Sequence, residues 1–315
     1  MLRAQTGRVV WSHVRGTASQ STVAGDGGID LDRYPVDRLD SPAAAHLIER
    51  AQAKLEDTGC ATFPRFMRPT ALASAASEAI QLAPSAFVTD AEHNAYQLAA
   101  PDLAYGPAHV RNLPMRTRVA SNAFDEFGPS SALRTLYSWP GLTQLIAAIT
   151  GGTCFRLADA LGCCSVNVFR PGWENAWHFD EAETTVTLCL QPAESGGAFE
   201  LTPQIRASQD DLAADDVTSV LCRHSAYEPE PLRRGGAQQR DKEGDEVPIT
   251  TASFEAGTLQ IFRGRYSLHR VTPVVGHRDR LVAGLCFADR PGVHNSAEVQ
   301  RMFWGREAPV PLKHC

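Results

Sequence analysis

The stretch WHFDEAETTVTLCLQ, residues 177–191, contains a histidine and an aspartate two positions apart. His178 and Asp180 stand where a turn containing Pro171 and Gly172 gives way to a run of strand-forming residues. Since alternate residues of a strand face the same side, the imidazole and the carboxylate are expected to face one point. Short motifs of this kind also recur by chance, so a surface pair is the competing interpretation. The pair needs a third group before it indicates a metal site.

A third candidate ligand, His269, lies in GRYSLHRVTPV, within a later strand-like segment of the same half of the chain. Two imidazoles and one carboxylate that leave other positions open form the facial triad of non-haem Fe(II) sites. Such ligands hold a divalent ion, while the open face admits a cosubstrate and O2. The sequence therefore predicts His178, Asp180 and His269 as metal ligands and catalytic residues.

Two arginines follow the third ligand, at the opening of the strand-like stretch RLVAGLCFA. Arg278 and Arg280 are two positions apart, so we expect them on one face of that strand. A guanidinium binds a carboxylate bidentately, which suits it to the far end of a dicarboxylate cosubstrate that chelates the metal. Arg280 is the first candidate because it lies further into the strand, and Arg278 is the alternative. A basic surface turn would explain one of the two.

The N-terminal half of the chain predicts a helical layer. SPAAAHLIERAQAKLEDTG has Ser41 as a cap, Pro42 at the first helical position and Gly59 as the stop. CATFPRF then predicts a short strand, and PTALASAASEAIQLAP a second helix. Residues 85–128 are polar and aromatic, and we expect an irregular segment there that covers the mouth of the site. Helical periodicity returns after it and resumes beyond Pro140.

From about residue 153 the chain changes to short strand-like segments separated by turns that contain glycine or proline. The clearest are CSVNVFRPG, TTVTLCLQPA, GGAFELTP, GTLQIFRGRYSLHRVTP and RLVAGLCFA. This pattern is typical of an all-β sandwich or barrel. The predicted fold class is therefore mainly β with a helical layer (α+β), in which N-terminal helices cover a jelly-roll core.

One stretch of the β half is out of character. EPEPLRRGGAQQRDKEGDEVP, residues 228–248, is charged and almost free of large apolar side chains, which predicts a disordered insertion loop. The expected divisions of the chain are a tail or targeting segment at 1–28, a helical and lid region at 29–152, the β core at 153–304, and a C-terminal tail at 305–315.

Composition excludes several classes of partner. The chain has 315 residues, 43% of them hydrophobic, and a net charge of −6, so a sizeable core is expected and a nucleic-acid partner is not. No apolar run approaches the roughly 20 residues that span a bilayer. The eight cysteines show no metal-pair or disulfide spacing, which favours a reduced, cytoplasmic setting. The first 25 residues contain three arginines and no acidic residue, so organelle targeting stays open for a eukaryotic source.

Three stretches resemble a known family. NVFRPGWENAWHFD, GGAFELTP and AGTLQIFRGRYSLHRVTPVVGHRDRLVAGL are similar to iron- and 2-oxoglutarate-dependent oxygenases, and more narrowly to the branch of free-amino-acid halogenases and their hydroxylase relatives. The resemblance covers roughly residues 153–206 and 254–292 and is looser between 93 and 150. It implies a double-stranded β-helix fold of the cupin-like kind, with Fe(II), 2-oxoglutarate and O2 as cofactor and cosubstrates and ascorbate in a supporting role.

The resemblance also assigns residues. It implies that His178, Asp180 and His269 hold the iron and that Arg280 clamps 2-oxoglutarate. Asn167 matches a position where the superfamily often has an asparagine that contacts the cosubstrate, although a plain polar strand residue explains it equally well. The halogenases of this branch have a small residue, usually glycine, where Asp180 stands. The resemblance therefore implies hydroxylation or a related oxidation in place of halogenation.

Four residues beside these are candidate substrate contacts, each with a plain packing or surface role as its alternative. Two flank the ligand pair, one lies in the segment expected over the mouth, where loops commonly carry recognition, and one follows the last strand. They are Asn175, Glu181, Arg116 and Trp304. Gly284 and Cys286 stand where lysine-type members of the family have polar side chains, which makes lysine a doubtful substrate.

Three functional classes stay open at this point. The first is an Fe(II)- and 2-oxoglutarate-dependent dioxygenase that hydroxylates or otherwise oxidises a small metabolite, with a free amino acid or a derivative as the candidate. The second is a metal-dependent cupin-like isomerase or lyase, against which the two arginines argue. The third is a non-catalytic β-barrel binding module, against which the complete ligand set argues. The sequence does not determine the oligomeric state.

Overall fold

The computed structural model describes residues 26–224 and 246–308 of the chain. The predicted insertion loop at 228–248 and the two predicted tails therefore lie largely outside the described residues. Within the two described ranges, no helix is both long and apolar enough to cross a membrane.

The main sheet is antiparallel and has the strand order β1-β11-β7-β14-β5-β3-β2, with β4 paired to β14 beside this path. Its strands are β1 (Cys60–Phe63), β2 (Phe87–His93), β3 (Met115–Asn122), β4 (Phe155–Arg156), β5 (Cys164–Phe169), β7 (Thr184–Gln191), β11 (Leu259–Phe262) and β14 (Arg280–Ala288).

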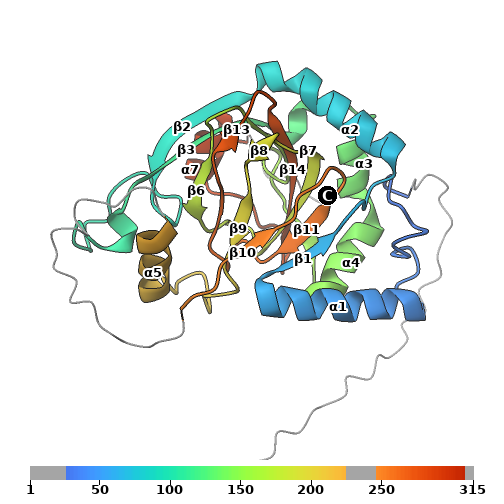
Figure 1. The fold of residues 1–315 in the computed structure, drawn as a ribbon, viewed down its shortest axis with the longest axis horizontal. Helices are drawn as coiled ribbons and strands as arrows, with labels where there is room; N and C mark the ends of the chain where they lie inside the picture. Colours follow the sequence, from blue (N-terminus) through green and yellow to red (C-terminus); the bar gives the residue numbers. More distant parts are fainter. Residues whose placement is uncertain (1–25, 225–245, 309–315) are drawn as a thin grey trace, which may run out of the picture.

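A second antiparallel sheet has the order β10-β9-β12-β6, and β13 pairs with β8. The chain alternates between the sheets, from β5 to β6 to β7 and again from β11 to β12 to β14 (Figure 1). This alternation of antiparallel strands is the double-stranded β-helix, so the predicted fold class is confirmed. The strands are β6 (Asn175–His178), β8 (Ser195–Gly196), β9 (Phe199–Leu201), β10 (Thr250–Ala252), β12 (His269–Val271) and β13 (Val274–Val275).

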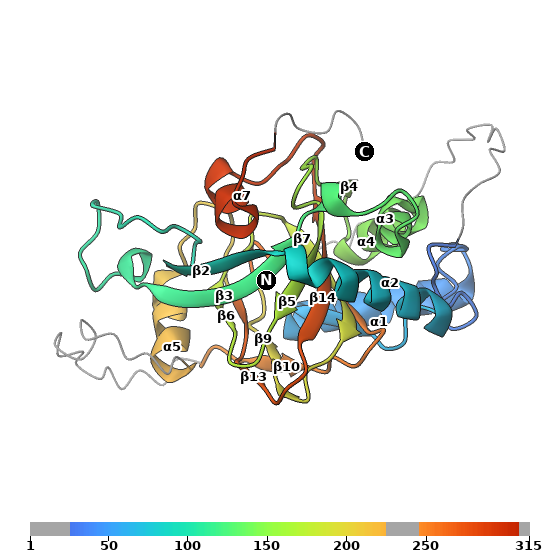
Figure 2. The same ribbon diagram turned by 90° about the horizontal axis from the view of Figure 1, so that it is seen from above.

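The predicted helical layer is also present. Four helices lie together on one side of the main sheet, whereas two others lie on the opposite side of the molecule (Figures 1 and 2). The first group is α1 (Pro42–Thr58), α2 (Pro69–Leu82), α3 (Ala132–Ser138) and α4 (Pro140–Thr150), and the second is α5 (Ala214–His224) and α7 (Ala297–Trp304). Short 3-10 turns occur at Ala83–Ser85, Val110–Asn112 and Phe124–Glu126.

The ends of α1 follow the capping rules. The hydroxyl of Ser41 accepts a hydrogen bond from the backbone N–H of Ala44 (3.2 Å), and Pro42 occupies the first turn, where a missing N–H costs nothing. Gly59 ends the helix with a φ of 78°, a left-handed conformation that glycine adopts without strain.

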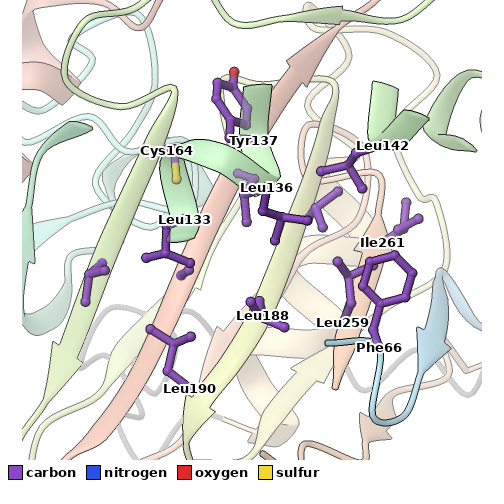
Figure 3. Close-up of a cluster of buried hydrophobic side chains, with 14 of the residues drawn as sticks. Phe66, Leu133, Leu136, Tyr137, Leu142, Cys164, Leu188, Leu190, Leu259 and Ile261 are labelled. Carbon is purple, nitrogen blue, oxygen red and sulfur yellow. The ribbon is translucent and has the colours of Figure 1, made fainter. Parts of the chain in front are cut away.

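Strand periodicity divides the main sheet into an apolar face and a face that lines a cavity. In β7, Val186, Leu188 and Leu190 belong to the hydrophobic core, and Figure 3 shows Leu188 and Leu190 beneath side chains of α3. The alternate residues Thr185 and Thr187 line the cavity. A slip of one residue would exchange the two faces, so this pattern fixes the register and with it the cavity wall.

The segment expected to be irregular, residues 85–128, instead contains β2 and β3, which pair with each other and extend the main sheet beyond β5. The expectation failed because β2 is an edge strand with mostly exposed side chains, so its composition resembles that of a loop. The main sheet thus draws strands from both sides of residue 153.

Candidate metal centre and its cavity

The three predicted ligands converge at the junction of the two sheets. His178 is the last residue of β6, Asp180 lies in the turn that leads to β7, and His269 is the first residue of β12. Antiparallel pairing of β12 with β6 sets His269 directly opposite His178. The Nε2 atom of each histidine is 3.4 Å from Oδ1 of Asp180, and all three ligand atoms lie within 4.8 Å of one another.

Hydrogen bonds orient each of these ligands. The Nδ1 atom of His178 is 2.7 Å from the carbonyl of Ala176, and that of His269 is 2.8 Å from the carbonyl of Ser267. Each ring therefore carries its proton on Nδ1 and turns the Nε2 lone pair toward the shared point, as metal-binding histidines do. The second ligand oxygen, Oδ2 of Asp180, accepts a 2.5 Å hydrogen bond from the hydroxyl of Thr185.

Electrostatics favour the protonation states that bind a cation. Burial lowers the pKa of His178, and the neighbouring His269 lowers it further. Burial alone would raise the pKa of Asp180, but the proximity of His269 and His178 holds it well below its usual range. The site therefore presents a neutral imidazole at His178 beside an ionised carboxylate.

The donor set fits a divalent transition metal. Bonds of about 2.1 Å at angles of roughly 90–110° place ligand atoms about 3.0–3.4 Å apart, which agrees with the two Nε2–Oδ1 distances. Two imidazoles and one carboxylate on a single side are the ligand set of the facial triad. Of the described residues, only these three form such a cluster of potential metal ligands.

The ligands open onto a cavity that reaches the surface of the protein. Arg280, the first residue of β14, lines this cavity and is only 3% exposed. Its guanidinium lies 5.3 Å from the ring centre of Phe169 and 4.6 Å from that of Phe254, and it has no hydrogen bond or ion pair to any described residue. Burial lowers its pKa to about 10, so it is a cation at neutral pH.

Asn167 also lines the cavity, from β5. Its Oδ1 accepts a hydrogen bond from the hydroxyl of Ser121 (2.9 Å), which fixes the orientation of the amide. Within residues 26–224 and 246–308 its Nδ2 has no hydrogen-bond acceptor. Asn167 thus offers a free donor on the sheet face that carries Arg280.

Two predicted site residues do not line the cavity. Arg278 precedes β14, so the two-residue period does not apply to it; it lies on the surface and donates to the carbonyls of Pro192 and Ala193. The side chain of Arg116 is 65% exposed and forms an ion pair with Asp90 across the β2–β3 hairpin (2.8 Å). Both side chains point to solvent, because each is held by surface acceptors.

Three predicted substrate candidates do line the cavity, together with Gly284 and Cys286. Asn175 accepts a hydrogen bond from the hydroxyl of Thr117 (3.0 Å), and its Nδ2 is 3.5 Å from Nε2 of His178. Glu181 accepts from the backbone N–H of Ser296 at the start of α7, and Trp304 lies at the end of that helix.

Sequence reasoning missed several residues of the cavity wall, among them the polar residues Thr185, Gln97 and Asn295. Thr185 could have been found from the alternation in TTVTLCLQ, which sets it on the face opposite Val186. Gln97 and Asn295 lie outside regular strands and helices, so no periodicity points to them.

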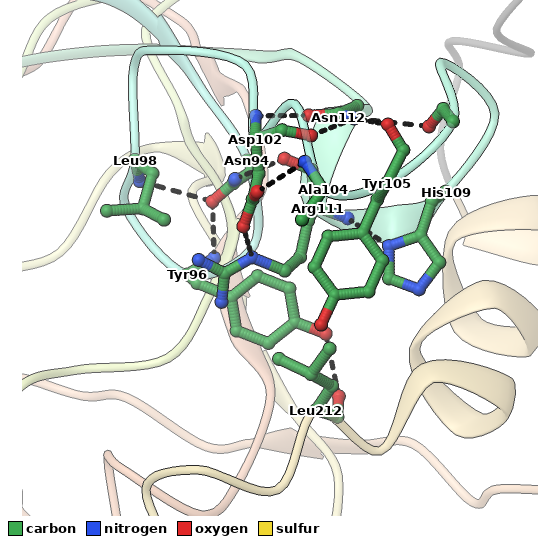
Figure 4. A network of polar contacts seen from close by, with 11 residues as sticks. Asn94, Tyr96, Leu98, Asp102, Ala104, Tyr105, His109, Arg111, Asn112 and Leu212 are labelled. Carbon is green, nitrogen blue, oxygen red and sulfur yellow. Dashed lines mark hydrogen bonds and ion pairs between the residues drawn. The ribbon is translucent and has the colours of Figure 1, made fainter.

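The loop that carries Gln97 is held by side chains around Asn94 (Figure 4). Oδ1 of Asn94 accepts from the backbone N–H groups of Tyr96 (2.9 Å) and Leu98 (3.1 Å), and its Nδ2 donates to the carbonyl of Arg111 (2.6 Å). The same loop accepts, through Ala95, the backbone N–H of the residue between His178 and Asp180 (2.8 Å). It is therefore fastened to the metal-ligand segment.

No protein-family model matches the sequence, and no curated protein sequence matches it. Several solved structures are similar. One is the non-heme α-ketoglutarate-dependent carbocyclase SnoK from nogalamycin biosynthesis, with 14% identity, 84% of this chain and 94% of that chain covered, and a TM-score of 0.51. The likeness concerns the fold alone.

Two others match less well by TM-score. The epimerase SnoN, in complex with Fe3+, α-ketoglutarate and nogalamycin RO, has 17% identity, covers 86% and 96% of the two chains, and has a TM-score of 0.49. A Pseudomonas putida prolyl-4-hydroxylase has 15% identity, covers 76% and 98%, and has a TM-score of 0.45.

Proposed function

We propose that the protein is a non-haem Fe(II)- and 2-oxoglutarate-dependent dioxygenase that acts on a small metabolite. The observation that carries this proposal is Arg280, a buried cation without an anionic partner among the described residues, in the same cavity as His178, Asp180 and His269. An unpaired buried charge is costly, so its retention is explained by an anionic ligand. A dicarboxylate that chelates the metal at one end and reaches Arg280 at the other fits both groups.

Each residue then has a defined role. His178, Asp180 and His269 hold the iron, which when bound supplies the activation of O2. Arg280 binds the distal carboxylate of 2-oxoglutarate, and Asn167 offers its free Nδ2 to the cosubstrate. The proposed cofactor and cosubstrate agree with the likeness in fold to SnoK, which is described as a non-heme α-ketoglutarate-dependent enzyme.

The hydrogen bonds around the ligands keep them ready for the metal. Thr185 holds the second oxygen of Asp180, so that Oδ1 faces the histidines, and the carbonyls of Ala176 and Ser267 fix the imidazole tautomers. A cupin-like isomerase or lyase would use the same ligands but would give Arg280 no anion to bind. A binding module without activity would need neither the three metal ligands nor an anion beside Arg280.

Hydroxylation or a related oxidation is the reaction that we propose. Asp180 supplies a carboxylate where halogenases of the resembled branch have a small residue, so a protein ligand fills the position that those enzymes keep open for a halide. The similar structures include a carbocyclase, SnoK, and an epimerase, SnoN. Reactions related to hydroxylation are therefore alternatives for this protein.

Turnover of the cosubstrate tests the proposal. The purified protein with Fe(II), 2-oxoglutarate, ascorbate and O2 is expected to release succinate, and omission of iron or an Asp180→Ala substitution should abolish this release. Mass analysis in chloride buffer should then show products that gain oxygen or lose hydrogen. Succinate formation that is independent of iron, or a chlorinated product, would contradict the proposal.

A further inference from the structure

Two buried amide side chains face the cavity without hydrogen bonds. Gln97 is 5% exposed and Asn295 is 7% exposed, and both line the cavity. Neither side-chain amide has a hydrogen-bond partner among residues 26–224 and 246–308. Their amide atoms are not enclosed by protein atoms, so they face the open space of the cavity, where a ligand can pair with them.

The other buried amide side chains of the described residues each make at least one hydrogen bond, although Oδ1 of Asn122 has no partner. Asn94 makes three side-chain hydrogen bonds. Gln260 donates to the carbonyl of Ser253 (3.1 Å) and accepts from the hydroxyl of Thr187 (3.2 Å). The free amides of Gln97 and Asn295 are thus a local feature of the cavity, which indicates that their partner is a ligand.

The backbone presents both amides from fixed positions. Gln97 has a φ of 61°, a left-handed conformation that is uncommon for residues other than glycine and that clusters at ligand sites. Its N–H donates to the carbonyl of Asn94 (3.0 Å), the residue at the centre of the network in Figure 4. The N–H of Asn295 donates to the buried carboxylate of Asp159 (2.9 Å).

The rest of this wall is apolar or acidic. Val299, Phe303 and Trp304 of α7 contribute apolar surface. Among the described lining residues, the side chains with a full charge besides the metal-ligand carboxylate are Arg280 and Glu181. Since Arg280 is assigned to the cosubstrate, these lining residues offer no second cation to the carboxylate of a free amino acid. A carboxylate buried there would lack a charged partner.

We infer that Gln97 and Asn295 are substrate-recognition residues and that the substrate is an uncharged small molecule with an apolar body. The inference rests on the proposed oxygenase function and narrows its substrate class. An amide both donates and accepts hydrogen bonds, so it matches carbonyl, hydroxyl and amide groups of a neutral ligand. Free amino acids are excluded from this class, whereas their neutral derivatives belong to it.

A first test needs no ligand. Gln97→Met and Asn295→Leu keep side-chain size and remove the amide, so they should leave the melting temperature unchanged or raised, because no hydrogen bond within the fold is lost. The matched controls Gln260→Met and Asn94→Leu break hydrogen bonds and should lower it by about 2–4 °C. If the cavity variants lose as much stability as the controls, the two amides serve the fold and the inference is overturned.

A second test uses matched probes of the wild-type protein loaded with Mn(II) and 2-oxoglutarate. The probes are the N-acetyl amides of phenylalanine, leucine and tryptophan and the corresponding free amino acids, so each pair shares an apolar body and differs in charge. At least one neutral probe should raise the melting temperature more than its free amino acid does. The affinity of the Gln97→Met or Asn295→Leu variant for this neutral probe should be about tenfold lower than that of the wild-type protein, because one hydrogen bond to the probe is lost.

The two proposals fail separately. If the wild-type protein binds no 2-oxoglutarate in the presence of metal, the oxygenase function fails, whatever the amide variants do. If 2-oxoglutarate binds but a free amino acid shifts the melting temperature more than its neutral counterpart, or no neutral probe shifts it, only the inference about Gln97, Asn295 and the substrate class is overturned.

Discussion

Replacement of Arg280 by methionine is expected to separate cosubstrate binding from folding. The side chain is buried beside Phe169 and Phe254 and has no anionic partner among the described residues. Methionine fills similar volume without a charge, and removal of a buried unpaired charge is neutral or stabilising. The melting temperature of Arg280→Met without cosubstrate should therefore equal or exceed that of the wild-type protein.

The affinity for 2-oxoglutarate should change in the opposite direction. Loss of one partner of a buried carboxylate–guanidinium pair costs about 2–5 kcal/mol, which is a roughly 30-fold to several-thousand-fold increase in Kd. Since the pKa of Arg280 is about 10, the wild-type affinity should also weaken as the pH rises through that value.

Calorimetric titration of 2-oxoglutarate into the Mn(II)-loaded protein measures this effect, and Arg278→Met is the matched control. Arg278 lies on the surface and donates only to the carbonyls of Pro192 and Ala193, so its replacement should leave the affinity unchanged. A normal affinity in Arg280→Met would refute the reasoning, and so would a loss in Arg278→Met alone.

Three further predictions follow from the surroundings of the ligands. Gly264→Ala should weaken metal binding measured by titration, because the added Cβ would lie 2.3 Å from the ligand carboxylate, whereas Gly152→Ala, with nothing within 4 Å, should not. Thr185→Val should raise the metal Kd by about 10–100-fold through loss of its hydrogen bond to that carboxylate, and Thr187→Val should not; equal effects would contradict the role of Thr185. Burial lowers the pKa of His93 from 6.5 to about 4, so as the pH falls the unfolded state binds a proton before the folded state does. The free energy of unfolding should therefore decrease by about 3 kcal/mol between pH 6.5 and pH 4. Denaturant unfolding at a series of pH values should show a smaller decrease for His93→Gln.

Local physical rules made much of the fold predictable. Ser41, Pro42 and Gly59 mark the ends of α1 because capping depends on adjacent residues alone. The short strand-like segments between turns likewise predicted the layered β core. The expectation that His178 and Asp180 face one point also holds, although Asp180 lies in the turn after β6 and not in a strand. These signals lie within a few residues of sequence, where the geometry is determined by the backbone.

Features that depend on distant contacts were not predictable. The sequence favoured Arg280 over Arg278 because it lies further into the expected strand, but only the structure shows that β14 begins at Arg280 and that Arg278 belongs to the preceding turn. The sequence did not predict the β2–β3 hairpin because β2 is an edge strand with mostly exposed side chains. Gln97 lies in a loop and has a left-handed backbone conformation, so no strand or helix period in the sequence predicts that it lines the cavity.

The most direct measurement of the central claim is the visible absorbance of the protein with Fe(II) and 2-oxoglutarate under anaerobic conditions. If one cavity holds both, a weak metal-to-ligand charge-transfer band should appear in the wild-type protein only when both are present. The band should be absent in His269→Ala and retained in His277→Ala, whose histidine is exposed and lies outside the cavity. A wild-type protein without the band, or a His269→Ala variant that keeps it at full intensity, would contradict the account.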